Sequence, residues 1–141
     1  MKRALGCAML VTFLLVPALP AAARTVATID IGQVALLETG KVRVVIRAYC
    51  APGYGVYFQD ASVHWRQQSD AGSFTSSSIT FYTDVLCDGV THNVVRRLPG
   101  RATSGDRLDP NIPLIVDAHM NLRNRAGAVA LAQAVESVVL G

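Results

Sequence analysis

Three histidines are the side chains of this sequence best suited to acid–base chemistry at neutral pH. His92 closely follows Asp84 and Asp88, and a histidine held by a carboxylate can serve as a general base. The alternative is a partly buried His92 that hydrogen-bonds the backbone near a disulfide, and we favour it. His64 and His119 alternate with apolar residues, so we expect both to be solvated on outward faces of strands.

The short motifs of the common hydrolases and nucleotide-binding enzymes are absent. The sequence contains no G-x-S-x-G, no H-E-x-x-H, and no P-loop or G-x-G-x-x-G between a strand and a helix. Its histidines, cysteines and acidic residues show no spacing typical of a metal site. We therefore expect a protein that is not an enzyme and has no metal or organic cofactor. A small secreted hydrolase or an enzyme inhibitor with an unrecognised site is the alternative.

Two cysteines, Cys50 and Cys87, remain once Cys7 is removed with the apolar N-terminal segment. An even pair in an exported protein is expected to oxidise, and the C-x-x-C spacing of redox-active pairs is absent. The two cysteines are 37 residues apart. Closing a loop of about that length is worth roughly 3–4 kcal/mol in the chain-entropy model. We predict a structural disulfide that joins inward-facing positions of two strands, with Trp65 close by.

Residues 1–23 have the pattern of a secretory signal peptide. Lys2 and Arg3 give a positive start, Ala4–Val16 is an uncharged apolar run, and Ala21–Ala23 offers small residues for cleavage. The apolar run is shorter than the roughly 20 residues needed to span a bilayer as a helix. We expect cleavage near Arg24, a secreted or cell-envelope location, and no transmembrane segment in the processed protein.

Removal of this leader changes the charge balance. Thirteen basic and ten acidic residues give the full chain a formal net charge of +3, but Lys2 and Arg3 leave with the leader. The remaining charge is near +1, which does not favour nucleic acid as a partner. Residues 24–141 are enough for one domain with a single core, but not for two.

Apolar and polar residues alternate with a period of two through most of the remaining chain, which is typical of half-buried β-strands. The predicted strands are Val26–Ile31, Val34–Thr39, Lys41–Cys50, Ala61–Gln67, Ser78–Cys87, Val90–Leu98 and Leu114–Leu122. Asp88-Gly89 lies between two of them and predicts a two-residue hairpin turn. The tail, Ala128–Leu140, could form a helix or a strand. We predict a strand that pairs with Leu114–Leu122 across a turn at Arg125–Gly127.

These strands and the disulfide predict an all-β protein, a single immunoglobulin-like antiparallel β-sandwich of about seven strands. Trp65 follows Cys50 at a distance that suits a tryptophan packed on a disulfide. Antibody domains carry a tyrosine two residues before their second cysteine, where this chain has Val85. The similarity to antibody domains is therefore one of architecture alone.

The predicted leader is followed by a strand that ends in Cys50 and by the pattern C-D-G-x-x-H, formed by Cys87, Asp88, Gly89 and His92. With the closing pair of alternating strands, this arrangement resembles an uncharacterised family of small secreted actinobacterial β-sandwich proteins. The resemblance covers most of residues 24–141. It implies a bacterial origin, the sandwich fold and export, and it implies no activity.

The first candidate for binding is an aromatic, glycine-bearing loop, Ala51–Phe58. Tyr54, Tyr57 and Phe58 would lie at one end of the sandwich, where such folds carry recognition residues. The alternative is that these rings cap the end of the core. The second candidate is Pro99–Asn111, a long segment without a regular pattern, which is either functional or a floppy crossover.

The third candidate is a basic row on an outer strand face. Arg43 and Arg47 alternate with apolar residues beside Lys41, and Arg66 could extend the row. Such a row is often only a solvated face, but it could meet an anionic cell-wall polymer. We therefore expect an exported, monomeric binding or interaction module whose partner is a protein or an anionic cell-wall polymer.

Overall fold

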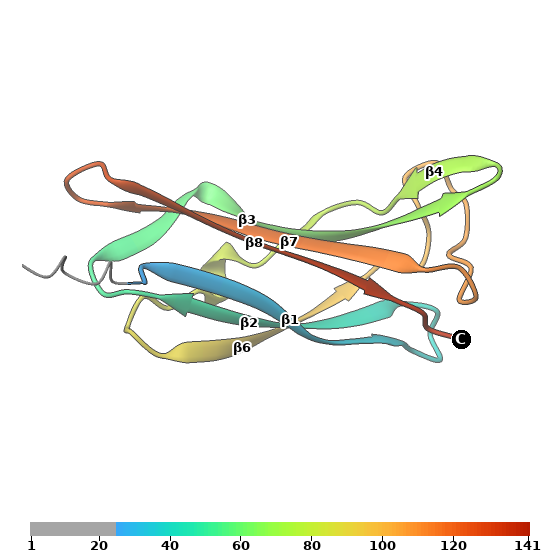
Figure 1. Ribbon diagram of the computed structural model, residues 1–141, viewed down its shortest axis with the longest axis horizontal. Helices are drawn as coiled ribbons and strands as arrows, with labels where there is room; N and C mark the ends of the chain where they lie inside the picture. The colour runs from blue at the N-terminus through green and yellow to red at the C-terminus, as the bar shows by residue number, and fades with distance from the viewer. Residues whose placement is uncertain (1–24) are drawn as a thin grey trace, which may run out of the picture.

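The computed structural model describes residues 25–141, and for residues 57–59 it describes the backbone only. The predicted leader and its cleavage site lie outside these residues. The described chain folds into two packed antiparallel sheets, as predicted, and contains no α-helix (Figure 1). None of its helical segments has the length and apolar composition needed to cross a membrane.

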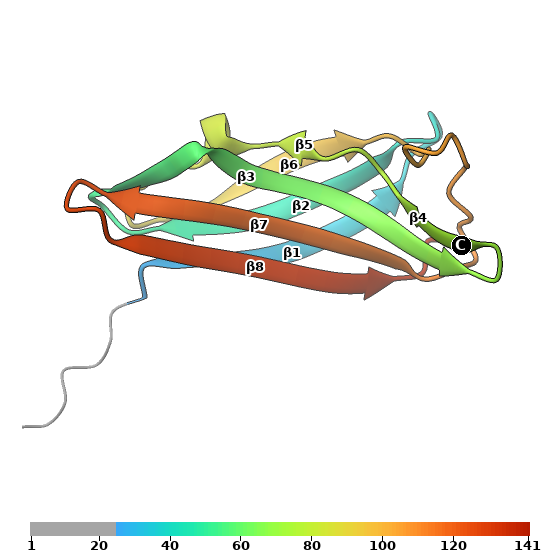
Figure 2. The same cartoon turned by 90° about the horizontal axis from the view of Figure 1, so that it is seen from above.

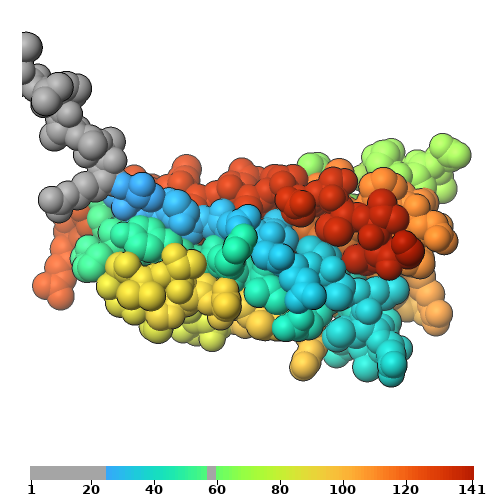
Figure 3. Space-filling model, turned by 60° about the horizontal axis from the view of Figure 1, so that its bottom comes forward, coloured from blue at the N-terminus to red at the C-terminus, as the bar shows by residue number. Residues whose placement is uncertain are grey.

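One sheet has three strands in the order β1-β2-β6, and the other has five, in the order β4-β3-β7-β8 with β5 paired to β3 (Figure 2). The strands are β1 (Ala27–Leu36), β2 (Val42–Cys50), β3 (Tyr54–Ser69), β4 (Gly72–Thr75), β5 (Ile79–Thr80), β6 (Thr91–Leu98), β7 (Leu114–Asn124) and β8 (Val129–Val138). A short 3₁₀ helix, η1 (Tyr82–Asp84), follows β5. β1 and β8 lie side by side where the edges of the two sheets meet (Figure 3).

The core lies between the sheets and is built by the alternation seen in the sequence. β2 and β7 bury every second residue, because successive side chains of a strand point to opposite faces. The largest fully buried side chains are Trp65 of β3 and Phe81, which precedes η1. The strands predicted at 41–50, 61–67, 90–98 and 114–122 are confirmed, although the second is part of a longer strand. The C-terminal strand and its pairing with β7 are confirmed as well.

The two short strands predicted on either side of Gly32 are a single strand, β1. The register of β1 against β2 shifts between Ile31 and Gln33, which indicates a β-bulge at Gly32. The extra residue lets Val34 pack against the core again after the bulge. The alternation therefore breaks in the sequence although the strand continues, and this is why the prediction of two strands was wrong.

The strand predicted at Ser78–Cys87 is mostly absent, and the hairpin predicted at Asp88-Gly89 is wrong. The chain here crosses from one sheet to the other, so β6 pairs with β2 and not with the segment before it. The Gly89 N–H donates to the Cys50 carbonyl (3.0 Å), and the Asp88 carboxylate accepts from the Val90 N–H (3.0 Å). The turn residues thus attach the crossover to the end of β2.

The predicted disulfide between Cys50 and Cys87 is confirmed, with Cα atoms 4.4 Å apart. Cys50 is the buried last residue of β2, but Cys87 lies in the irregular crossover and not in a strand. The prediction that Trp65 lies close by is wrong. Its indole N–H donates to the Pro99 carbonyl (2.7 Å), next to the β6 residue that pairs with Val42. The length of β2 separates Val42 from Cys50 by about 26 Å, at about 3.3 Å per residue.

Candidate functional site

The β1–β2 turn and the loop after β6 meet at one end of the sandwich and leave a cleft of about 520 Å³ between them. Its walls are Leu36 and Glu38–Lys41 on one side and Pro99–Arg101, Arg107 and Leu108 on the other. We call this site the cationic cleft. It brings together two of the three segments predicted to bind, because its cations come from the basic row and from the long loop.

The loop after β6 is folded back on itself, which is why its two arginines lie close together. Arg101 and Arg107 form an isolated antiparallel bridge. The Leu108 N–H donates to the Gly100 carbonyl (3.0 Å) and closes the base of this small hairpin. Directly opposite residues of an antiparallel pair project to the same side, so both arginines belong to one wall of the cationic cleft.

The buried side chain of Gln67 anchors the end of this loop to β3. Its amide nitrogen donates to the carbonyls of Asp109 (2.7 Å) and Ile112 (2.9 Å), and its oxygen accepts from the Asp109 N–H (3.0 Å). The Thr103 N–H donates to the carbonyl of Thr75, the last residue of β4 (2.8 Å). The loop is therefore held in place by hydrogen bonds and is not a floppy crossover.

The two walls of the cleft touch at Gly40 and Gly100. A Cβ atom on Gly100 would overlap the carbonyl oxygen of Gly40, so the approach requires a residue without a side chain. Gly40 itself has a φ of 76°, in the left-handed region that glycine adopts without steric cost. The spacing of the walls is thus set by a contact between two backbones.

Positive charge in the cationic cleft is not balanced by the protein itself. Among the described residues, the side chains of Lys41 and Arg107 have no ion-pair or hydrogen-bond partner, and Arg101 donates only to the Gly105 carbonyl (2.8 Å). Arg97 is likewise unpaired and lies near Lys41 in a shallower depression beside the cleft. Glu38 is the only acidic residue in the cleft walls. The site is therefore electropositive and suited to an anion.

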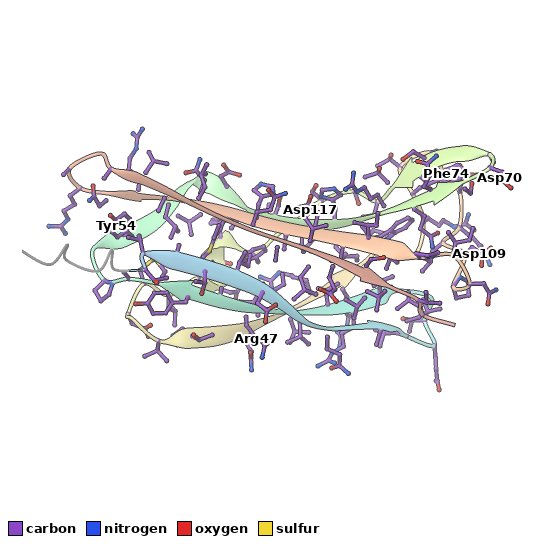
Figure 4. The ribbon with its side chains drawn as sticks, viewed as in Figure 1. Arg47, Tyr54, Asp70, Phe74, Asp109 and Asp117 are labelled. Carbon is purple, nitrogen blue, oxygen red and sulfur yellow. A yellow bond between two sulfur atoms is a disulfide. The ribbon has the colours of Figure 1, made fainter. Side chains whose placement is uncertain are left out.

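The aromatic segment predicted as a loop belongs to β3, because its backbone pairs with the end of β7. Tyr54 packs half-buried against the core and lines a second, shallower pocket with Arg123 and Arg125. Figure 4 shows Tyr54 at the end of the sandwich opposite the loop that forms the cationic cleft. The side chains of Tyr57 and Phe58 lie outside the described residues.

The basic row is split between the two sheets. Arg47 forms an ion pair with Asp30, and Arg43 donates to the side-chain oxygen of Gln33 (3.0 Å). Both arginines lie on the three-stranded sheet, where Figure 4 shows Arg47 pointing outward. Arg66 is exposed on β3, in the other sheet. These side chains therefore form no continuous basic surface.

His92 pairs with Asp88, with 2.8 Å between Nε2 and the carboxylate. The hydrogen bond from the Val90 N–H, and to a smaller extent the one with His92, holds the pKa of Asp88 below its usual value of 3.8. Asp84 does not join this pair, because it forms an ion pair with Arg96. The His92–Asp88 pair lies toward the disulfide end of β2 and is separate from the cationic cleft.

A second histidine cluster is one that the sequence did not predict. The register of β3 against β7 places Ser62 opposite His119, whose Nε2 lies 3.4 Å from Ser62 Oγ and 3.0 Å from the Asp60 carboxylate. A Ser-His-Asp triad needs the hydroxyl and the carboxylate on different ring nitrogens, whereas both groups here contact Nε2. The cluster is therefore not arranged as a hydrolase triad. His64, which we predicted to be solvated, is half-buried, and its Nδ1 is inaccessible and unpartnered.

Within residues 25–141, no group of three or more histidine, cysteine, aspartate or glutamate side chains is placed to hold a metal ion. Comparisons with protein-family models, with curated proteins and with solved structures found no match for this chain. Function is therefore inferred from the geometry and charge of the chain itself.

Proposed function

We propose that this protein is an exported, non-enzymatic binding module that holds an anionic cell-wall polymer in the cationic cleft. The observation that carries the proposal is the convergence of Lys41, Arg101 and Arg107 on one cleft with a single acidic residue. Cations that line a concave site raise the local concentration of anions, because low-dielectric walls focus their field. Arginine also suits phosphate and carboxylate groups, since its planar fork can bind two oxygens at once.

The surroundings of the cleft favour a polymer over a small anion. Arg97 extends the positive charge beyond the cleft into the neighbouring depression, so successive charges of a chain could be bound along the surface. Leu36, Pro99 and Leu108 add apolar wall for the carbon backbone between the charges. The hydrogen bonds from Gln67 and Thr103 support the proposal further, because an ordered loop loses little entropy when it binds.

Export is supported by the leader predicted at residues 1–23 and by the Cys50–Cys87 disulfide, since disulfides persist in oxidising compartments. N-terminal sequencing of the protein recovered from the medium or the cell envelope should begin within about two residues of Arg24. A recovered product that begins at Met1 would contradict the proposed cleavage.

The binding proposal is tested with two matched double variants. Lys41→Gln with Arg107→Gln removes two unpaired, exposed charges from the cationic cleft, and Arg66→Gln with Arg125→Gln removes two unpaired, exposed charges elsewhere. At about 0.5–1 kcal/mol per surface charge, the first variant should weaken binding to purified anionic wall polymer about 5- to 30-fold. The control should bind nearly as well as the unmodified protein.

Titrations by calorimetry at low and high salt would separate the outcomes. An equal loss of affinity in both variants would show that only net charge matters and would refute a defined site. Unchanged binding in the cleft variant would refute the cleft itself. Tighter binding of polyglutamate than of wall polymer would point to an acidic protein as the partner instead.

A further inference from the structure

The last strand, β8, forms one edge of the five-stranded sheet and leaves one side of its backbone unpaired. Over the ten residues Val129–Val138 it pairs with β7, and no other strand of residues 25–141 pairs with it. Figure 2 shows β8 at the margin of the sheet, and Figure 3 shows it exposed along the surface beside β1. A long unpaired edge is a template for pairing with another strand.

The outward side chains of β8 are largely apolar. Val129, Leu131 and Val135 have exposed fractions of 53%, 75% and 51%, and Gln133 is the one polar residue between them. Glu136 is the only charged residue of the strand. An apolar row on a free sheet edge is stabilised when a further strand covers it, because the row then loses contact with water.

The other sheet edges of the described chain carry features that hinder pairing. β1 is interrupted by the bulge at Gly32, and β4 has only four residues. On β6, Arg96 donates to the Thr80 carbonyl (3.0 Å) and forms an ion pair with Asp84, which ties this edge to the opposite sheet. Bulges, short strands and inward-pointing charges are the devices that protect natural sheet edges. β8 is longer than β4 and is not interrupted by a bulge, and its one inward-facing charge, Glu136 opposite the buried Val116, lies near its C-terminal end.

We propose that β8 pairs antiparallel with β8 of a second copy of this chain, so that two five-stranded sheets become one continuous sheet. A two-fold axis at Gln133 would place Leu131 opposite the other copy's Val135, and Ala130 opposite the other copy's Glu136. Leu131 and Val135 then meet across the interface, Val129 faces Ser137, and the only carboxylate faces a small alanine and not its own copy. A two-fold interface requires this self-complementarity, which is why the partner is a second copy. The proposal replaces the monomer expected from the sequence.

The oligomeric state tests the proposal through two matched leucine variants. Leu131 on β8 and Leu86 in the crossover are both exposed, at 75% and 54%, so lysine at either position should leave the fold intact. By light scattering after size exclusion at micromolar concentration, the protein expressed from the complete sequence should have twice the mass of one processed chain. Leu131→Lys should halve the measured mass, and Leu86→Lys should leave it unchanged. A monomeric unmodified protein, or a Leu131→Lys variant that stays dimeric, would overturn the proposal.

Cysteine cross-linking tests the register. Gln133→Cys would bring two thiols to opposite positions of neighbouring strands, about 5 Å apart between Cβ atoms, where a disulfide can form. Val129→Cys would leave the two thiols about 26 Å apart, because each would then face position 137 of the other copy. Only Gln133→Cys should yield a covalent dimer on non-reducing electrophoresis. Cross-linking of both variants or of neither would overturn the register.

Discussion

Gln67 is the side chain whose replacement most directly tests how the cleft is held. It is only 4% exposed, and its amide makes three hydrogen bonds to the backbone at Asp109 and Ile112. Gln67→Met keeps the approximate length and shape of the side chain while it removes all three bonds. The loop between β6 and β7 then loses its anchor on β3.

The expected loss of stability in Gln67→Met follows from the backbone groups that are left without a hydrogen-bond partner. A buried polar group that loses its hydrogen bond costs about 1–3 kcal/mol. Asp109 is exposed, so water can replace part of the loss at that residue, whereas Ile112 is half-buried. We therefore expect Gln67→Met to lower the free energy of unfolding by about 2–3 kcal/mol in total.

Urea denaturation followed by tryptophan fluorescence is a suitable assay, because Trp65 is the only tryptophan of the chain and is fully buried. Gln68→Met is the matched control. Gln68 is the exposed neighbour of Gln67, so its replacement should change stability by less than about 0.5 kcal/mol. A decrease below about 1 kcal/mol for Gln67→Met, with an unchanged denaturant slope, would refute the assigned anchoring role.

Three further predictions concern the disulfide, the cleft walls and pH. Replacing both disulfide cysteines with alanine should lower the free energy of unfolding by roughly 2–5 kcal/mol in urea denaturation, because it removes a cross-link between positions 37 residues apart. Gly100→Ala should cost about 1–3 kcal/mol, since its Cβ would overlap the facing turn, whereas Gly55→Ala, which meets no atom within 4 Å, should cost less than about 0.5 kcal/mol. Val90 and His92 lower the pKa of folded Asp88, so its ionised form contributes stability above pH 3.8 that is lost as pH falls through the lowered value. The difference in unfolding free energy between the unmodified protein and Asp88→Asn should therefore shrink in urea titrations at acid pH. A difference that stays the same at neutral and acid pH would contradict this role of Asp88.

Most strands could be predicted from the sequence because alternation is a local property. A strand turns successive side chains to opposite faces, so Leu114–Leu122 shows its buried row in the order of its residues. The C-terminal tail has only partly buried alanines on its inner face, and its pattern fitted a helix as well as a strand. The same property misled the prediction at Gly32, where a bulge shifts the alternation although the strand continues. The disulfide followed from counting, since Cys50 and Cys87 are the only cysteines after the predicted leader.

Only the tertiary structure decided which strands pair, in which register, and what their loops bring together. Pairing of β2 with β6 places the turn at Gly40 against the loop at Gly100, and it carries Lys41 into the cleft with Arg101 and Arg107. No local pattern connects these residues, because the contacts join segments far apart in the chain and depend on packing of the whole sheet. The sequence by itself left the C-terminal tail open between helix and strand and favoured a strand only through its expected pairing with Leu114–Leu122. The fold decided that this strand, β8, lies at a free edge of the sheet.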